Sequence, residues 1–288
     1  MTVRMGLVGA GPWATMFTGP MLAAGPDTTL AAVWARRPEA AAELGDRLRT
    51  PVAASFDALL ESCDAVAFAV PPDVQAELAP LAVAAGRHLL LEKPLAFTVD
   101  AAERIAAAAE AAGVVTQLML TNRWTDAVQT FLADVQAAGP RVLTAEFIGS
   151  GALAGSPFAT PWRRQDMALH DVGPHVFDLV TAAAGPATVV HAHRAGAVTA
   201  VTLEHENGAV SHTALSITTP GAHGPMRCEA VTDTGRIVLT DPAAEDPVTV
   251  RERIAAGFAE AVAAGVSSAL DVHHGVRLQR LLAAAAGR

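Results

Sequence analysis

Short apolar runs alternate with alanine-rich segments of helical periodicity over the first 120 residues. The runs that predict strands are 3–8, 30–34, 65–70, 88–91 and 114–120. Helices are predicted between them, for example at 38–49 and 98–112, and Gly113 suits the C-terminal cap of the latter. Alternation of this kind predicts a parallel sheet covered by helices on both faces.

The pattern changes after a predicted helix at 124–138. Six further runs then follow with few helices between them, at 141–149, 188–194, 197–206, 209–218, 227–233 and 236–240. Turn signals at Asn207-Gly208 and Thr234-Gly235 join neighbouring runs, which predicts an open, mostly antiparallel sheet. One helix, 170–184, interrupts this sheet, and two more, 252–264 and 271–286, close the chain. The Gly/Ser/Pro-rich stretch 149–161 is the best candidate for a mobile loop.

A glycine-rich turn follows the first predicted strand. Residues 9–14 read GAGPWA, which fits the pattern G-x-G-x-x-G/A of a strand-to-helix turn. Gly9 permits the tight turn, Gly11 lets a pyrophosphate approach the backbone, and Ala14 allows close packing of helix on strand. Pro12 and Trp13 then open the helix, whose N-terminal amides suit phosphate. We therefore predict a dinucleotide site at residues 9–14.

The end of the second strand indicates which dinucleotide binds. NAD-binding domains normally carry an acidic residue there, which holds the ribose 2′-hydroxyl. This chain has Ala35 instead, followed by Arg36 and Arg37. A guanidinium can bind a 2′-phosphate and stack on adenine, so we favour NADP(H) over NAD(H). The alternative is that both arginines are solvated loop charges.

Lys93 is the only lysine of the chain, and every other one of the 20 Lys/Arg positions is arginine. Together with Glu92 it follows the apolar run His88 to Leu91, where a buried strand emerges. A compact ammonium and a planar guanidinium are not interchangeable donors. The lone lysine is therefore either a strand-end charge or a residue that the chemistry requires.

Composition narrows the possible partners. The net charge of −9 and the pI near 5.5 argue against nucleic acid and anionic membranes as partners. We expect no membrane span, because no apolar run is long enough, and no signal peptide. We expect a reducing, cytoplasmic location, because Cys63 and Cys228 form no disulfide framework. No metal site is expected, since the histidines lack a third ligand. The absence of tyrosine excludes any mechanism that needs a tyrosine acid.

Several motifs together resemble the Gfo/Idh/MocA oxidoreductases. These are GAGPWA, VPPDVQ after the third strand (which includes Val70 and Pro71 at its start), EKP at 92–94, and Asp171-x-x-x-His175 within HDVGPHVFDLV. The resemblance covers essentially the whole chain. It implies a Rossmann domain followed by an α+β domain on an open, mostly antiparallel sheet. It also implies NAD(P)-dependent hydride transfer at a sugar, cyclitol or related carbinol.

The same resemblance implies roles for individual residues. Val70, Pro71, Glu92 and Lys93 would contact the cofactor. Lys93 would be the catalytic lysine near the nicotinamide, His175 the proton-transfer residue, and Asp171 its substrate-binding companion. Arg123, Trp162 and Arg163 would fall where the family often has pocket or structural residues, and we assign them to substrate binding. Gln75 stands where many members have histidine, and we assign it no chemistry.

The chemistry of the residues agrees with these roles. Histidine titrates near neutrality and suits exchange of a hydroxyl proton, and a fixed ammonium suits a developing oxyanion. Asp171 and His175 are four apart and share a helix face, and Asp171 is expected near the helix start. The alternative for His175 is a core histidine. His170 faces about 100° away from Asp171 and ranks second.

We therefore predict an α/β protein of two domains, 1–121 for dinucleotide binding and 122–288 for substrate binding and assembly. The last helix, about 271–286, is a candidate to pack back on the first domain. The expected function is NADP-dependent reduction of a keto-sugar or similar small molecule. Alternatives are a non-catalytic sensor or scaffold, and a lyase or hydrolase that uses transient cofactor redox. One sheet face needs a cover, so a homo-oligomer through that face is expected.

Overall fold

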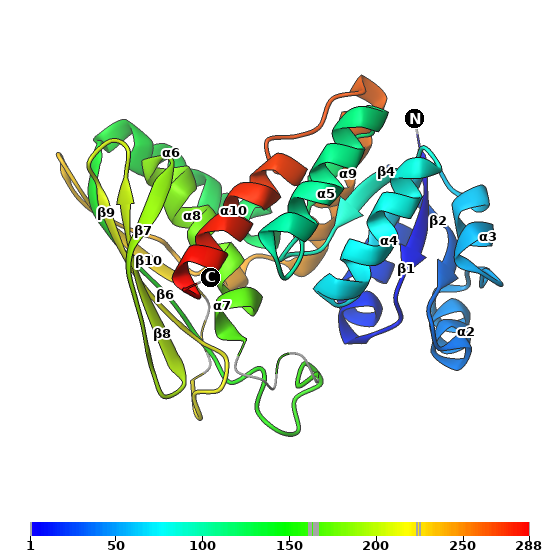
Figure 1. Ribbon diagram of the computed structural model, residues 1–288, viewed down its shortest axis with the longest axis horizontal. Helices are drawn as coiled ribbons and strands as arrows, with labels where there is room; N and C mark the ends of the chain where they lie inside the picture. The colour runs from blue at the N-terminus through cyan, green and yellow to red at the C-terminus, as the bar shows by residue number, and fades with distance from the viewer. Residues whose placement is uncertain (1, 161–162, 164–166, 223, 225, 288) are drawn as a thin grey trace. The chain divides into compact units, whose positions relative to one another are not determined.

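The computed structural model describes residues 2–160, 163, 167–222, 224 and 226–287. The chain divides into two compact units (Figure 1). One contains residues 1–119 and 247–277, and the other contains 120–246 and 278–288. No helix in the described part of the chain has the length and apolarity needed to cross a membrane.

The first unit is built on a five-stranded parallel sheet. Its strands stand in the order β2-β1-β3-β4-β5, where β1 is Val3–Val8, β2 Thr28–Trp34, β3 Ala65–Phe68, β4 His88–Leu91 and β5 Thr116–Leu118. All four residues of β3 are buried, as expected for a parallel strand covered on both faces. The sheet is therefore parallel, as the alternating apolar runs predicted.

Helices connect these strands. They are η1 (Ala14–Thr18), α1 (Gly19–Ala23), α2 (Pro38–Leu48), α3 (Phe56–Ser62), α4 (Pro72–Ala84) and α5 (Val99–Ala112). Figure 1 shows α4 and α5 side by side. The Thr98 hydroxyl caps the start of α5 by accepting from the Ala101 N–H, and Gly113, at φ +63°, ends it as predicted.

A C-terminal segment completes the first unit. Residues 247–277, which the sequence analysis grouped with the second domain, include α9 (Pro247–Ala264) and belong to this unit. The Leu118 N–H donates to the Leu270 carbonyl at 2.6 Å, and the Thr116 N–H donates to the Ser267 hydroxyl at 2.9 Å. These bonds occupy the outer edge of β5, which would otherwise present unpaired backbone groups.

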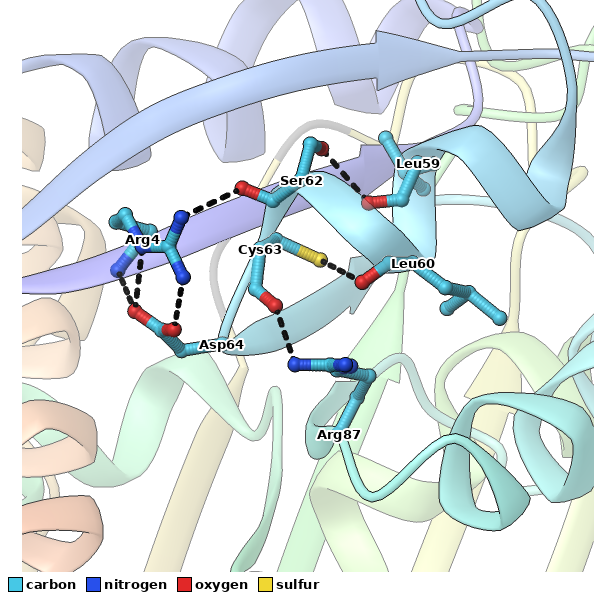
Figure 2. A network of polar contacts seen from close by, with 7 residues as sticks. All are labelled: Arg4, Leu59, Leu60, Ser62, Cys63, Asp64 and Arg87. Atoms are coloured by element: carbon cyan, nitrogen blue, oxygen red, sulfur yellow. Dashed lines mark hydrogen bonds and ion pairs between the residues drawn. The ribbon is translucent and has the colours of Figure 1, made fainter.

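A polar network joins the amino ends of β1, β3 and β4 (Figure 2). Arg4 donates twice to the Asp64 carboxylate, at 2.6 and 3.1 Å, and Arg87 donates to the Cys63 carbonyl at 2.8 Å. The Arg4 hydrogen bond lowers the pKa of Asp64, and burial raises the pKa of the Cys63 thiol. The network lies at the strand ends opposite to the glycine turn, so it stabilises the sheet away from the predicted cofactor site.

The second unit contains a six-stranded sheet in the order β11-β10-β6-β9-β8-β7. The strands are β6 (Pro140–Ile148), β7 (Ala187–Ala195), β8 (Val198–His205), β9 (Val210–Ser216), β10 (Arg227–Thr232) and β11 (Gly235–Val238). Strands β6 and β9 pair in parallel, and the other four pairs are antiparallel. The sheet is therefore mixed, and mostly antiparallel as predicted.

Helices cover one face of this sheet, while the other face remains exposed. The helical elements are η2 (Thr121–Trp124), α6 (Asp126–Ala138), α7 (Ala168–Asp171), α8 (Gly173–Ala184) and η4 (Pro242–Ala244), and α10 (Val272–Ala285) contributes to both units. Helices α6 and α8 pack together, and α8 packs on β6 and β9. Leu143 and Leu215 are fully buried, whereas Val142 is 37% exposed and Val238 61%.

Candidate functional site

The carboxyl ends of the parallel strands lie at one edge of the first sheet. Strand β1 has β2 on one side and β3 on the other, so the chain changes direction across the sheet between β1 and β3. Ligands of open α/β sheets bind outside the carboxyl ends at such a point. Predicted cofactor-binding residues follow the carboxyl ends of four strands. They are Gly9 after β1, Ala35 after β2, Val70 and Pro71 after β3, and Glu92 and Lys93 after β4.

Gly9 is required by the geometry of this edge. Its φ is +114°, and a Cβ at this position would lie 2.4 Å from the Ala69 carbonyl oxygen. Its N–H donates to the Trp34 carbonyl at 2.8 Å, which ties the turn to the end of β2. Only glycine permits the ends of β1, β2 and β3 to approach this closely.

Gly11 has the opposite surroundings. Among the described residues, and apart from the two chain neighbours, no heavy atom lies within 4 Å of the position that its Cβ would take. The backbone here is open on the side where a side chain would stand. That opening fits the close approach of a pyrophosphate, which the sequence predicted for this residue.

The helix after the turn contains a π-helical segment, η1, which the sequence did not reveal. The Gly19 N–H reaches back to the Ala14 carbonyl, and Ala14 is fully buried, in keeping with its expected packing role. The Trp13 and Phe17 rings stack at 4.6 Å, with 5° between their planes. The Arg251 guanidinium lies 5.3 Å from the Phe17 ring centroid and donates to the Met16 carbonyl at 3.1 Å. Helix α9 therefore holds the helix that Pro12 and Trp13 open.

The three residues after β2 differ in exposure. Ala35 is half-buried, and Arg36 and Arg37 are exposed immediately before α2 begins at Pro38. The Trp34 ring packs against Phe56 at 5.4 Å, which anchors the end of the strand. The small side chain at position 35 introduces no negative charge, and the arginines follow it directly.

Lys93 lies in the loop that leaves β4 and is half-buried. Its backbone N–H donates to Glu92 Oε2 at 3.3 Å. The loop is also bonded to the side chain of Gln75, a fully buried residue of α4 to which the sequence analysis assigned no role.

The second unit positions the remaining predicted residues around α7 and α8. Asp171 is the last residue of α7, and α8 begins at Gly173, so the single helix predicted from 170 to 184 is two helices. Pro174 lacks an N–H and Gly173 packs against Leu282 and Leu215, which accounts for the break at Val172. Asp171 therefore lies at the junction between α7 and α8, two residues before α8 begins.

Asp171 and Arg163 form an ion pair. Arg163 Nε lies 3.0 Å from Asp171 Oδ2, and the two side chains are only 19% and 15% exposed. His175 is half-buried on α8, with its ring centroid 6.4 Å from that of Phe147. The structure thus brings together two of the residues assigned to the substrate, and Trp162 lies outside the described residues.

Arg123 forms an ion pair within the second unit. Its Nη1 lies 2.8 Å from Asp178 Oδ1, and the Asp178 side chain is 3% exposed. This pair fastens η2 to α8.

His170, the second-ranked histidine, is buried at 6% exposure. Among the described residues, no three His, Cys, Asp or Glu side chains gather as a metal site would require.

The all-parallel sheet, the change of strand direction and the glycine turn define a Rossmann dinucleotide-binding domain. Residues 3–120 match a family model described as "Oxidoreductase family, NAD-binding Rossmann fold". The first domain therefore matches the NAD-binding domain of the Gfo/Idh/MocA oxidoreductases, the family that the motifs of the sequence resemble.

Characterised relatives align with about half of the chain or less. It is 31% identical over 144 residues to UDP-N-acetylglucosamine 3-dehydrogenase of Acidithiobacillus ferrooxidans, which covers 50% of this chain and 45% of the relative. It is 36% identical over 115 residues to dTDP-3,4-didehydro-2,6-dideoxy-alpha-D-glucose 3-reductase of Streptomyces antibioticus, with coverage of 39% and 35%. These alignments therefore span less than half the length of either relative.

A solved structure shows that both units share a known fold. The crystal structure of GenD2 from gentamicin A biosynthesis, in complex with NAD, superimposes with a TM-score of 0.85 at 22% identity. The match covers 100% of this chain and 95% of GenD2. At this identity the likeness establishes the fold alone.

Proposed function

We propose that the protein is an NADP-dependent oxidoreductase that transfers hydride between the nicotinamide and a carbinol or carbonyl carbon of a sugar, cyclitol or related small molecule, acting as a reductase. The observation that carries this proposal is the edge of the first sheet. Gly9 and the open backbone at Gly11 occupy the change of strand direction, and the lone lysine follows a strand end at the same edge.

The preference for NADP(H) is supported by the half-buried Ala35 and the exposed Arg36 and Arg37. A charge-assisted contact to a 2′-phosphate contributes roughly 1.5–3 kcal/mol, or about one to two decades in affinity. We expect NADPH to bind more tightly than NADH, and the Ala35→Asp/Arg36→Ala double variant to reverse the order. Calorimetric titration measures both. Equal or tighter NADH binding by the unmodified protein would contradict the preference.

The proposed chemistry assigns one role to each polar residue. The bound cofactor supplies the hydride. The Lys93 ammonium stabilises negative charge on the substrate oxygen, the His175 imidazole exchanges the hydroxyl proton, and Asp171 binds the substrate together with Arg163 and Trp162. Arg123 acts indirectly in this scheme, because its ion pair with Asp178 positions α8.

The activities of the two relatives, a 3-dehydrogenase and a 3-reductase of nucleotide-linked sugars, support a sugar-like substrate. The direct test is a screen for NADPH oxidation with keto-sugars, keto-cyclitols and simple ketones. Lys93→Arg should lose at least about two decades in turnover, comparable to loss of an oxyanion donor. Full activity in Lys93→Arg would show that the lysine is only a strand-end charge.

Two other functions are separable by the same screen. A sensor or scaffold would bind NADPH without turning over any substrate. A lyase or hydrolase that oxidises and re-reduces its substrate would form product without a net change in NADPH absorbance. The presence of Lys93 together with His175 and Asp171 favours the oxidoreductase, since a non-catalytic protein needs none of them.

The exposed face of the second sheet supports assembly as a homo-oligomer. Val142 and Val238 are exposed there, although Leu143 and Leu215 on the helical side are buried. We propose that a second copy covers this face in a cytoplasmic dimer or larger assembly. Light scattering of the wild type and of Val142→Arg checks this, since the charge should shift the mass toward the monomer.

A further inference from the structure

Gln75 makes three hydrogen bonds to the loop that carries Lys93, although it lies on a different element. Its side chain is fully buried. Nε2 donates to the carbonyl oxygens of Glu92, at 2.9 Å, and of Leu95, at 3.0 Å, while Oε1 accepts from the Glu92 N–H at 2.8 Å. Both amide protons and the amide oxygen are therefore used on one loop.

The location of these bonds explains why the loop needs them. Pairing between β4 and β5 ends at Leu91 and Leu118, so Glu92 leaves the sheet with an N–H and a carbonyl that no strand satisfies. Gln75 bonds to both, in the two-bond arrangement that one residue offers another across an antiparallel sheet. Pro94 has no N–H, and the bond to Leu95 holds the chain on its far side.

We propose that Gln75 is the positioning residue for Lys93. Its amide fixes the backbone on both sides of the lysine, from Glu92 to Leu95, and thereby fixes the direction in which the ammonium leaves the loop. The consequence for turnover rests on the proposed catalytic role of Lys93. The geometry of the loop does not rest on that role, because it follows from the three hydrogen bonds alone.

Only a carboxamide of this length meets the requirement. Glutamate would bring a carboxylate toward two carbonyl oxygens and lose both donors. Methionine fills a similar volume with no donor, which leaves the N–H and carbonyl of Glu92 and the carbonyl of Leu95 without this partner. Histidine offers one donor and one acceptor, and can therefore replace part of the set.

Because Lys93 is the only lysine, its side-chain amine can be followed without ambiguity. Acylation with a small reagent modifies Lys93 and the N-terminal amine, and peptide mapping separates the two. We compare wild type with Gln75→Met, Gln75→His and Val83→Ala. Val83 is 4% exposed in the same helix, so its truncation is a control for loss of packing in α4 without loss of the amide.

In unliganded protein, we expect Gln75→Met to change the labelling rate of Lys93 at least about threefold, with the N-terminal rate as internal standard. Turnover should fall about 10- to 100-fold, because a misplacement of about 1 Å in a catalytic group costs up to about 10²-fold. The KM for NADPH should stay near normal. Gln75→His should recover part of both effects, and Val83→Ala should show neither.

The outcomes separate this inference from the proposed function. A folded Gln75→Met protein with wild-type labelling of Lys93 would overturn the positioning role. If Gln75→Met does not fold, wild-type labelling and turnover in Gln75→His would overturn it, and so would losses in Val83→Ala equal to those in Gln75→His. Suppose instead that Gln75→Met changes the labelling rate of Lys93 while the wild-type protein turns over no carbonyl substrate. That result would uphold the positioning role and refute the proposed activity.

Discussion

Alanine substitutions at Gly9 and Gly11, made one at a time, should separate the stability of the first unit from binding of the cofactor. The two glycines are two residues apart in the same turn, yet their surroundings differ. Gly9 has φ +114° and the Ala69 carbonyl 2.4 Å from the position of a Cβ. Gly11 has no positive φ, and apart from its chain neighbours no atom of the described residues lies within 4 Å of that position.

The magnitudes follow from these differences. A non-glycine residue at a rarely populated positive φ costs about 1–3 kcal/mol, and the new contact with the Ala69 backbone, directly after β3, adds a similar amount for overpacking. Gly9→Ala should therefore destabilise the protein by about 2–6 kcal/mol. Gly11→Ala should instead stabilise it by up to about 1 kcal/mol, because alanine restricts the unfolded chain. Its methyl group, however, occupies the space proposed for the pyrophosphate, so affinity should fall by about one to two decades.

Urea unfolding gives the stability of each variant, and calorimetric titration with NADPH gives the affinity. The dependence of the unfolding free energy on urea concentration serves as a control for gross structural change, and both variants should keep the wild-type slope. Undiminished NADPH binding by a stable Gly11→Ala protein would refute the placement of the pyrophosphate at this turn. Wild-type stability in Gly9→Ala would show that the ends of β1 and β3 can separate without cost.

Three further results are expected. His175→Ala should lower turnover by about 10²–10⁴-fold with near-normal NADPH affinity, and His170→Ala should do less; steady-state kinetics would contradict this if the order were reversed. Burial lowers the pKa of His205 below 6.5, so its contribution to stability is present above about pH 6.5 and is lost as the pH falls through the folded value. Urea midpoints between pH 5 and 8 should vary less in His205→Gln, without becoming flat, because the pKa of His88 is lowered in the same way. Gln279 is 1% exposed, and neither of its side-chain polar atoms has a hydrogen-bond partner in the described part of the chain. Gln279→Met should therefore raise the free energy of unfolding by about 1–3 kcal/mol. A destabilised variant would contradict this.

The strands of the first sheet could be located from the sequence because both of their faces are buried. Such strands appear as continuous apolar runs, and the predicted bounds of β1 and β4 coincide with Val3–Val8 and His88–Leu91. The predicted run 114–120 is longer than β5, Thr116–Leu118, because Met119 and Leu120 are buried outside the ladder. Burial, and not strand pairing, is what the apolar pattern records.

Pairing between distant segments could not be predicted in this way. The parallel pair β6–β9 joins strands that are separated by β7 and β8 in the chain, and no local signal marks it. Residues 247–277 join the first unit through bonds to the backbone of β5, which depend on the edge being free and not on the periodicity of the segment. The break at Val172 was also missed, although Gly173-Pro174 within a helical pattern is a local signal for it.

The same distinction explains why the candidate site residues were found and Gln75 was not. Gly9, Ala35 and Lys93 are recognised by their position directly after a strand. Gln75 acts through backbone groups that lie 17 and 20 residues away, and no spacing rule connects them. A signal was nevertheless present, because the side chain lies among the buried apolar positions of α4, and a buried carboxamide must find partners. In a Rossmann crossover helix the nearest backbone that lacks partners is at the carboxyl ends of the strands, where the ladder stops. A glutamine on the buried face near the start of such a helix therefore points to a loop at that edge, which here is the loop proposed to carry the chemistry.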